Sequence, residues 1–128
     1  MKKIFLLSSL FAAALSLVSF AGSAQETGST TLKGFLMDKM CSNGVMASKD
    51  PVAAARQHTK ECATEDHCAL TGYGIVADGK FYVFDKKGNA LVKEMLKNTS
   101  KTDNLSIEVV GTQAKDGKLK VEALKESE

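Results

Sequence analysis

All cysteines and histidines of the chain lie within one stretch of 28 residues. These five side chains are Cys41, His58, Cys62, His67 and Cys68. Thiolates and neutral imidazoles are the usual ligands of tetrahedral zinc sites, including those of the Cys₃His type. We therefore predict a metal site whose ligands are Cys41, His58, Cys62 and Cys68, with His67 as a spare ligand.

The spacing of His58 and Cys62 favours this site, because residues four positions apart lie on the same face of a helix. A helix is expected here, since Asp50 is a good N-cap and Pro51 suits the first helical position. We expect it to run from Pro51 to Cys62. Cys68 then follows in a loop that can fold back toward the helix.

Zinc and copper are both compatible with these ligands. Zinc binds thiolates and imidazole together, whereas soft thiolates near Met37, Met40 and Met46 also suit Cu(I). Methionines are more often core residues, and we expect this of Met37 and Met95. The chain contains neither C-x₂-C nor H-x₃-H, the short ligand pairs typical of zinc motifs.

Two other interpretations of the cysteines stay open. A single disulfide could join Cys41 to Cys62 or to Cys68, or could close the short loop between Cys62 and Cys68. A link to Cys41 would tie this segment to the strand before it and typically add about 2–4 kcal/mol of stability. Alternatively, Cys62 with His58 one helical turn away could form an activated, redox-active thiol.

The first 24 residues have the features of a cleaved export signal. Lys2 and Lys3 precede an apolar run from Ile4 to Phe20, and small residues follow up to Ala24, as signal peptidases require. We expect cleavage near Ala24 and a soluble periplasmic or secreted protein with no membrane span after cleavage. Because exported cysteines tend to pair, the odd number of three is notable.

Charge excludes one class of partner. Two of the 17 basic residues and none of the 15 acidic ones lie in the signal, so the mature chain has no formal net charge. Nucleic-acid-binding domains usually carry a basic patch, so no nucleic-acid partner is expected. The remaining 104 residues suit one small domain. We expect a flexible tail over residues 25–30 and a single domain over residues 31–128.

The first half of this domain should contain three strands. The first is expected over Thr31–Asp38, with Gly34 where a barrel strand bends or is closely approached. Strands over Tyr73–Ala77 and Lys80–Phe84 are joined by Asp78-Gly79, which favours a two-residue hairpin turn.

The sequence of the second half of the domain predicts a helix and two more strands. Residues 85–89 should form a turn, and residues 89–98 have apolar side chains at helical spacing. The last two strands flank a turn at Asp116-Gly117. Their dry face should consist of the alternating residues Leu105, Ile107, Val109, Leu119, Val121 and Ala123.

Five antiparallel strands with one helix between strands 3 and 4 are typical of the OB-fold, a mainly β barrel. This chain departs from the OB-fold by a helical insertion between strands 1 and 2, residues 39–71, which contains every Cys and His. Connections of this length are usually functional or disordered, and a helix with clustered cysteines argues against disorder. The segments "GFLMDKMC" and "HTKEC", then a further Cys before "GYGIVADGKFYVFDKKGN", resemble short exported bacterial OB-fold-like proteins of uncharacterised function. This resemblance implies the fold and no particular activity.

We therefore predict an exported, non-enzymatic binding domain for a soft or borderline metal ion, zinc or copper. The chain has no Ser/His/Asp signature, phosphate-binding loop or HExxH motif. The alternative is a disulfide-stapled structural or interaction module of the cell envelope, with an envelope protein as its partner. A second alternative is a thiol redox protein.

Overall fold

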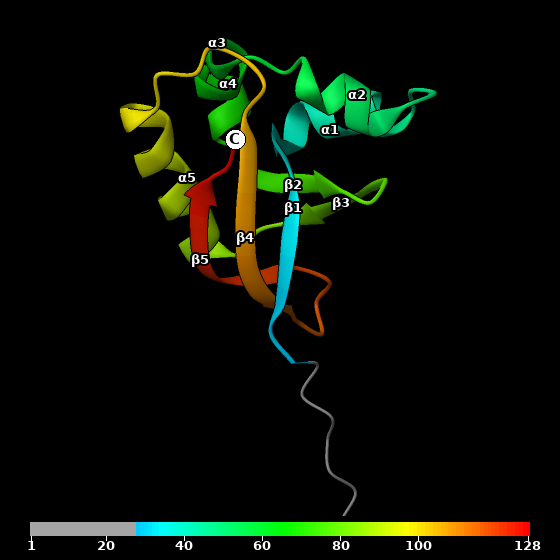
Figure 1. Ribbon diagram of the computed structural model, residues 1–128, viewed down its shortest axis with the longest axis vertical. Helices are drawn as coiled ribbons and strands as arrows, with labels where there is room; N and C mark the ends of the chain where they lie inside the picture. The colour runs from blue at the N-terminus through cyan, green and yellow to red at the C-terminus, as the bar shows by residue number, and fades with distance from the viewer. Residues whose placement is uncertain (1–27) are drawn as a thin grey trace, which may run out of the picture.

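A single antiparallel sheet of five strands forms the centre of the protein (Figure 1). The computed structural model describes residues 28–128, so the expected signal over 1–24 and residues 25–27 of the expected tail lie outside the described residues. The strand order is β3-β2-β1-β4-β5, which confirms the predicted mainly β class with five antiparallel strands. The strands are β1 (Thr30–Asp38), β2 (Tyr73–Ala77), β3 (Lys80–Val83), β4 (Ser106–Gln113) and β5 (Leu119–Glu126).

Strand β1 joins two hairpins, because its two halves pair with different neighbours. Residues 30–35 pair with β4, and residues 35–38 pair with β2. In Figure 1, β2 and β3 consequently run across the direction of β4. Gly34 lies where the two pairings meet, and a Cβ atom there would be 2.0 Å from the carbonyl oxygen of Val76. The close approach expected at this glycine is therefore present.

The sheet does not close into a barrel. Among the described residues, the two edges of the sheet meet where Phe84, just after β3, bridges to Leu119 of β5. Beside this bridge, Asp85 N donates to Leu119 O at 3.0 Å and the Asp85 side chain accepts from Val121 N at 3.2 Å. A closed barrel has no free edge strands. Within residues 28–128, the fold is thus an open five-stranded sheet whose two edges approach each other at one point.

The two hairpins differ in regularity. Asp78 and Gly79 both have positive φ, 51° and 72°, as the predicted type I′ turn requires. In the other hairpin, Val110 lies opposite Ala123 but Gly111 lies opposite Val121. The extra residue is a bulge, which reverses the alternation of side chains. Ala123, expected on the dry face, is therefore exposed.

The predicted insertion between strands 1 and 2 is confirmed. It contains four short helices, α1 (Lys39–Met46), α2 (Pro51–Arg56), α3 (Lys60–Thr64) and α4 (Asp66–Ala69). Asp50 caps α2 as expected, and its side chain accepts a hydrogen bond from Ala53 N. The prediction of one continuous helix to Cys62 is wrong, because the helix ends at Arg56 and Thr59 starts a new one by accepting from Cys62 N.

Helix α5 (Lys86–Asn98) connects β3 to β4, as predicted, but begins earlier than expected. Asp85 is its N-cap, and the Asp85 side chain accepts a hydrogen bond from Gly88 N. The segment 85–89, expected to be a turn, is therefore the cap and first turn of the helix. None of the helices described in residues 28–128 is both long and apolar enough to cross a membrane.

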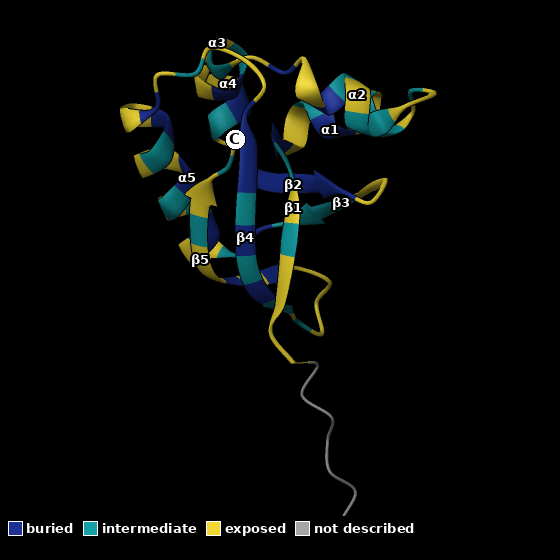
Figure 2. Cartoon of the chain, in the orientation of Figure 1, coloured by how far each residue is buried: buried dark blue, intermediate teal, exposed yellow. Residues whose placement is uncertain are grey.

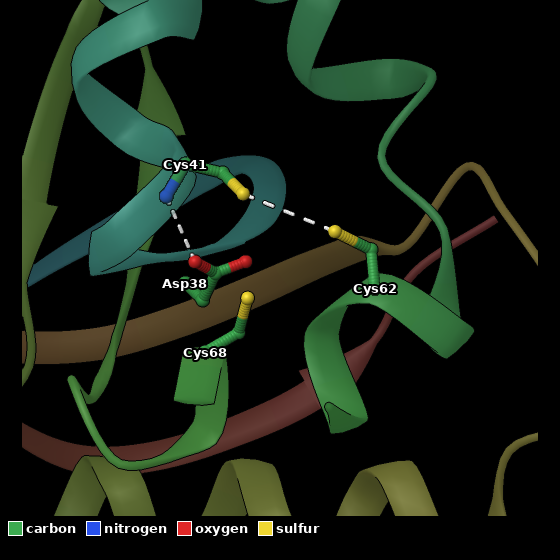
Figure 3. Close-up of side chains that lie close together, drawn as sticks. All are labelled: Asp38, Cys41, Cys62 and Cys68. Atoms are coloured by element: carbon green, nitrogen blue, oxygen red, sulfur yellow. Dashed lines mark hydrogen bonds between the residues drawn. The ribbon is translucent and has the colours of Figure 1, made fainter. Parts of the chain in front are cut away.

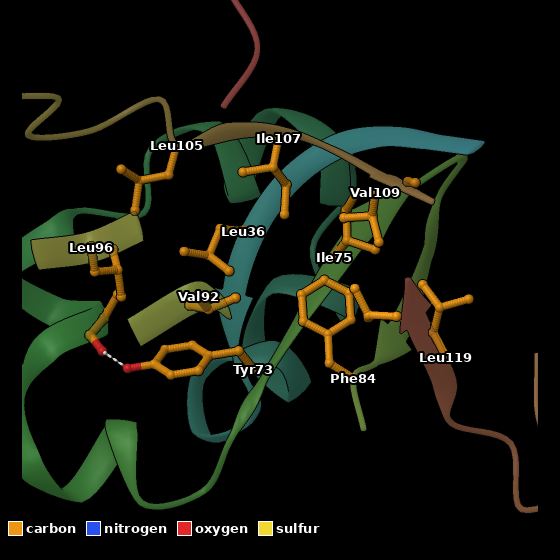
Figure 4. Close-up of a cluster of buried hydrophobic side chains, with 13 residues drawn as sticks. Leu36, Tyr73, Ile75, Phe84, Val92, Leu96, Leu105, Ile107, Val109 and Leu119 are labelled. Atoms are coloured by element: carbon orange, nitrogen blue, oxygen red, sulfur yellow. Dashed lines mark hydrogen bonds between the residues drawn. The ribbon is translucent and has the colours of Figure 1, made fainter. Parts of the chain in front are cut away.

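Two apolar clusters cover the two faces of the sheet near β1, because Leu36 and Met37 are neighbours and point to opposite faces. Met37 packs with Ala55 and Val76 beneath α1 and α2. Leu36 belongs to the main core under α5, which Figure 4 shows; Figure 2 shows the same buried band along β2 and β4. The main core consists of Leu36, Ala63, Tyr73, Ile75, Ala77, Phe84, Val92, Leu96, Leu105, Ile107, Val109, Leu119 and Val121.

Gly34→Ala should destabilise the protein, because its Cβ would overlap the backbone of Val76 and force β1 away from β2. We expect the free energy of unfolding, measured by urea denaturation, to fall by at least about 2 kcal/mol. Gly44→Ala in α1 is the matched control, since a Cβ there meets nothing within 4 Å. The control should be neutral or slightly stabilising. Equal stability of the two variants would contradict the tight contact.

Candidate metal centre

Three thiols and one carboxylate come together at the end of β1 (Figure 3). Asp38 is the last residue of β1, Cys41 lies in α1, Cys62 in α3 and Cys68 in α4. One oxygen of Asp38 and the three sulfur atoms all lie within 4.8 Å of one another. The structure thus brings together the three cysteines of the predicted site and adds Asp38, which the sequence did not suggest.

Each of the three cysteines is the third residue of its helix. The residue three positions earlier is the N-cap: Asp38 accepts from Cys41 N, Thr59 accepts from Cys62 N, and Glu65 precedes α4. Three helix N-terminal turns therefore meet around the sulfur atoms. The N-terminal turn of a helix carries partial positive charge and favours negatively charged groups. In the sequence, the three cysteines share one pattern: two residues separate each cysteine from the N-cap residue of its helix.

Hydrogen bonds hold these short helices in place. Tyr73, buried in the main core, donates its hydroxyl to Ala63 O at 2.8 Å and so fixes α3 (Figure 4). Thr71 links the other two helices, since its hydroxyl donates to Cys68 O at 2.7 Å and accepts from Met40 N at 3.1 Å. The cysteines are therefore positioned by the sheet and core rather than by the short helices alone.

The spacing of the sulfur atoms suits a tetrahedral ion. Cys41 Sγ and Cys62 Sγ are 3.8 Å apart, too far for a disulfide, whose sulfur atoms are about 2.0 Å apart. Two thiolates that each lie about 2.3 Å from a tetrahedral zinc ion are about 3.8 Å from each other. All three cysteines are free thiols in the structure.

Asp38 has no exposed surface, and its two oxygens have different surroundings. Oδ1 accepts a hydrogen bond of 2.9 Å from Cys41 N, whereas Oδ2 has no aligned hydrogen bond within the described residues. In Figure 3, the second oxygen points toward the space between the three sulfur atoms. A buried carboxylate oxygen without a full set of partners is unfavourable. A cation between the sulfur atoms would give this oxygen a partner besides the neighbouring His58.

His58 lies beside Asp38 rather than among the thiols. It follows α2 in a segment outside any helix, so it does not share a helical face with Cys62 as expected. Its Nε2 is buried and lies 2.8 Å from Asp38 Oδ2, and neither atom has an aligned hydrogen bond. His58 is outside the group of atoms within 4.8 Å of one another. Its position suits a residue that orients and balances Asp38.

His67 occupies a different, exposed place. Its Nε2 lies 3.4 Å from a carboxylate oxygen of Glu65. Together with Cys68, these two side chains form a second group whose ligand atoms lie within 4.8 Å of one another. The two groups share Cys68.

The methionines divide between core and surface. Met37 is fully buried and Met95 packs against the main core, which confirms both expectations. Met46 packs against the smaller cluster, and Met40 is about half exposed.

Burial and the nearby Asp38 carboxylate raise the pKa of the Cys41 thiol to about 12, and the neighbouring Cys62 and Cys68 add to the shift. The pKa of Cys68 is also raised, chiefly by burial and by Asp38. Burial lowers the pKa of His58, although Asp38 opposes this. Near pH 7, Cys41 and Cys68 are therefore protonated and His58 is neutral.

The fold and the site together define a small mainly β domain with a cluster of three cysteines and an aspartate in an insertion after its first strand. Comparison of the chain with protein-family models, curated proteins and solved structures found no match. The functional argument therefore depends on the geometry and chemistry of the cluster.

Asp38→Asn should make Cys41 more reactive in reduced, chelator-treated protein. Asparagine can still accept the hydrogen bond from Cys41 N but removes the charge that raises the thiol pKa. A larger fraction of Cys41 is then thiolate, the reactive form, and we expect iodoacetamide to modify it at least about threefold faster. Peptide mass spectrometry measures the rate.

Asp50→Asn is the control for this experiment, because the Asp50 side chain caps α2 by accepting the same kind of hydrogen bond from Ala53 N. The Cys41 rate should not change in this variant. An unchanged rate in Asp38→Asn would show that the aspartate charge does not govern the thiol.

Proposed function

We propose that this protein binds one zinc ion through Cys41, Cys62, Cys68 and Asp38. The observation that carries the proposal is the convergence of three sulfur atoms and a fully buried carboxylate within 4.8 Å. Three thiolates and one carboxylate form a closed tetrahedral set, which is the arrangement of structural zinc sites. The sulfur separation of 3.8 Å supports the same coordination.

Asp38 favours zinc over copper. Cu(I) prefers soft sulfur ligands, whereas zinc accepts thiolate, imidazole and carboxylate ligands. The methionines offer little to a copper ion, since Met37 is packed in the apolar cluster with Val76 and Met40 is about half exposed to solvent. A ligand set with a buried carboxylate is therefore better suited to a borderline divalent ion.

His58 supports the proposal through charge. Three thiolates and one carboxylate carry more negative charge than a divalent ion neutralises, and excess buried charge is unfavourable. The His58 imidazole lies 2.8 Å from Asp38 Oδ2. A neutral His58 can donate a hydrogen bond to this oxygen and stabilise its charge, and a protonated His58 would offset part of the excess, as residues behind metal ligands commonly do.

The proposal includes export and an OB-like scaffold. The signal-like first 24 residues support a periplasmic or secreted location. The order of five strands, with a helix before the last hairpin, supports an OB-like relationship despite the open sheet. A bound ion would also protect the thiols, because oxidising compartments promote pairing of free cysteines.

A disulfide-stapled module of the cell envelope is the second candidate. Its support is the contact between Cys41 and Cys62, whose sulfur atoms are the pair 3.8 Å apart. A small movement of α3 would allow a bond that ties α1 to α3. A thiol redox role has less support, because redox-active thiols usually have lowered pKa values and those of Cys41 and Cys68 are raised.

Native mass spectrometry of the protein, purified from the compartment to which it is exported, tests the proposal. We expect one zinc ion per chain in the wild type. Single replacement of Cys41, Cys62 or Cys68 by Ser should abolish retention of the ion, and Asp38→Asn should lower zinc affinity at least about tenfold. Affinity should also increase with pH, because the thiols release protons when the ion binds.

Asp66→Asn is the control for zinc retention, since Asp66 is an exposed carboxylate beside the site that belongs to neither group of ligand atoms. It should bind zinc like the wild type. A wild-type protein without metal, whose mass is lower by two hydrogens, would contradict the zinc proposal. That result would favour the disulfide-stapled module.

A further inference from the structure

A second group of zinc-type ligands adjoins the proposed centre. Glu65, His67 and Cys68 place one ligand atom each within 4.8 Å of the others. Cys68 also belongs to the inner group with Asp38 and Cys41. A single buried sulfur atom therefore lies within reach of both groups, so an ion bound at one group is already adjacent to the other.

The two groups differ in exposure. The side chains of His67 and Glu65 are 64% and 51% exposed, respectively. In the inner group, Asp38 is fully buried and Cys41 and Cys62 are half-buried. The shared Cys68 is buried. Glu65 and His67 are therefore more accessible to an ion in solution than Asp38 is.

Glu65 and His67 are arranged as ligands rather than as structural supports. Glu65 precedes α4, yet its side chain makes no capping hydrogen bond. It instead faces His67, with 3.4 Å between the carboxylate oxygen and Nε2. Carboxylate, imidazole and thiolate are all zinc ligands, and three protein ligands leave a fourth position for a water molecule or an incoming carrier.

We propose that Glu65 and His67, with Cys68, form a capture site that passes zinc to the inner centre. This inference rests on the proposed zinc centre. The ion first binds the Glu65 carboxylate, the His67 imidazole and the Cys68 thiolate, whose proton goes to solvent. Asp38 and the thiolates of Cys41 and Cys62 then replace Glu65 and His67, and the two thiol protons also go to solvent. Cys68 stays bound throughout.

The capture site narrows the class of ion. Glu65 and His67 supply oxygen and nitrogen ligands, which suit a borderline divalent ion such as Zn²⁺ better than soft Cu(I). An ion must be acceptable to both groups to pass between them. Both contain a carboxylate together with at least one thiolate, and zinc tolerates this combination.

Stopped-flow loading experiments test the proposal. Reduced, chelator-treated full-length mature protein is mixed with Zn²⁺ bound to a chromophoric chelator, and loss of the zinc–chelator absorbance gives the rate. In the double variant Glu65→Gln and His67→Ala, we expect loading to slow at least about tenfold, because the exposed ligands that raise the local ion concentration are gone. The equilibrium zinc affinity should stay at the wild-type value, because the inner ligands are intact.

Asp66→Asn is again the matched control, and it should load at the wild-type rate. Wild-type loading rates in the double variant would overturn the capture role. A loss of equilibrium affinity as large as that of Cys68→Ser would also overturn it, because Glu65 and His67 would then be ligands of the resident ion. Two retained zinc ions in the wild type, with one lost in the double variant, would show a separate second site instead. If the wild type binds no zinc at all, the zinc centre itself fails.

Discussion

The buried carboxylate of Asp38 is the constraint around which the site is organised. It lies at the end of β1, where the strand leaves the sheet, and has no exposed surface. One oxygen caps α1 through Cys41 N, and the other lies beside His58 and faces the three sulfur atoms. A carboxylate in this position is costly unless cations or donors satisfy it. In the proposed zinc centre, an ion bound among the three sulfur atoms would satisfy this carboxylate.

The sheet and the insertion have separate roles in this arrangement. Pairing of β1 with both β2 and β4 fixes the direction in which β1 delivers Asp38. Short helices are marginal by themselves, but Tyr73 fixes α3 from within the core and Thr71 joins α4 to α1. The three helix N-terminal turns thereby meet at one point. The fold thus holds the side chains of the cluster in place, and zinc binding as proposed would not have to order the insertion.

The parts of the fold that depend on local signals could be predicted from the sequence. Alternating apolar residues and the Asp78-Gly79 turn located the strands, and the insertion between strands 1 and 2 followed from them. The helix boundaries that depend on capping residues were not predicted correctly. Helix α2 ends at Arg56 and Thr59 starts the next helix, so His58 and Cys62 do not share a helical face. Asp38 was not predicted as a ligand, because its burial depends on contacts between the end of a strand and segments that are distant in the sequence.

Zinc K-edge X-ray absorption of the zinc-loaded protein tests the central claim most directly, because it reports which atoms contact the ion. The account predicts three sulfur ligands at about 2.3 Å and one oxygen at about 2.0 Å, with the oxygen contribution altered in Asp38→Asn. A shell of only nitrogen and oxygen atoms would contradict it. So would a spectrum with three sulfur ligands that is unchanged in Asp38→Asn, since the carboxylate would then not bind the ion.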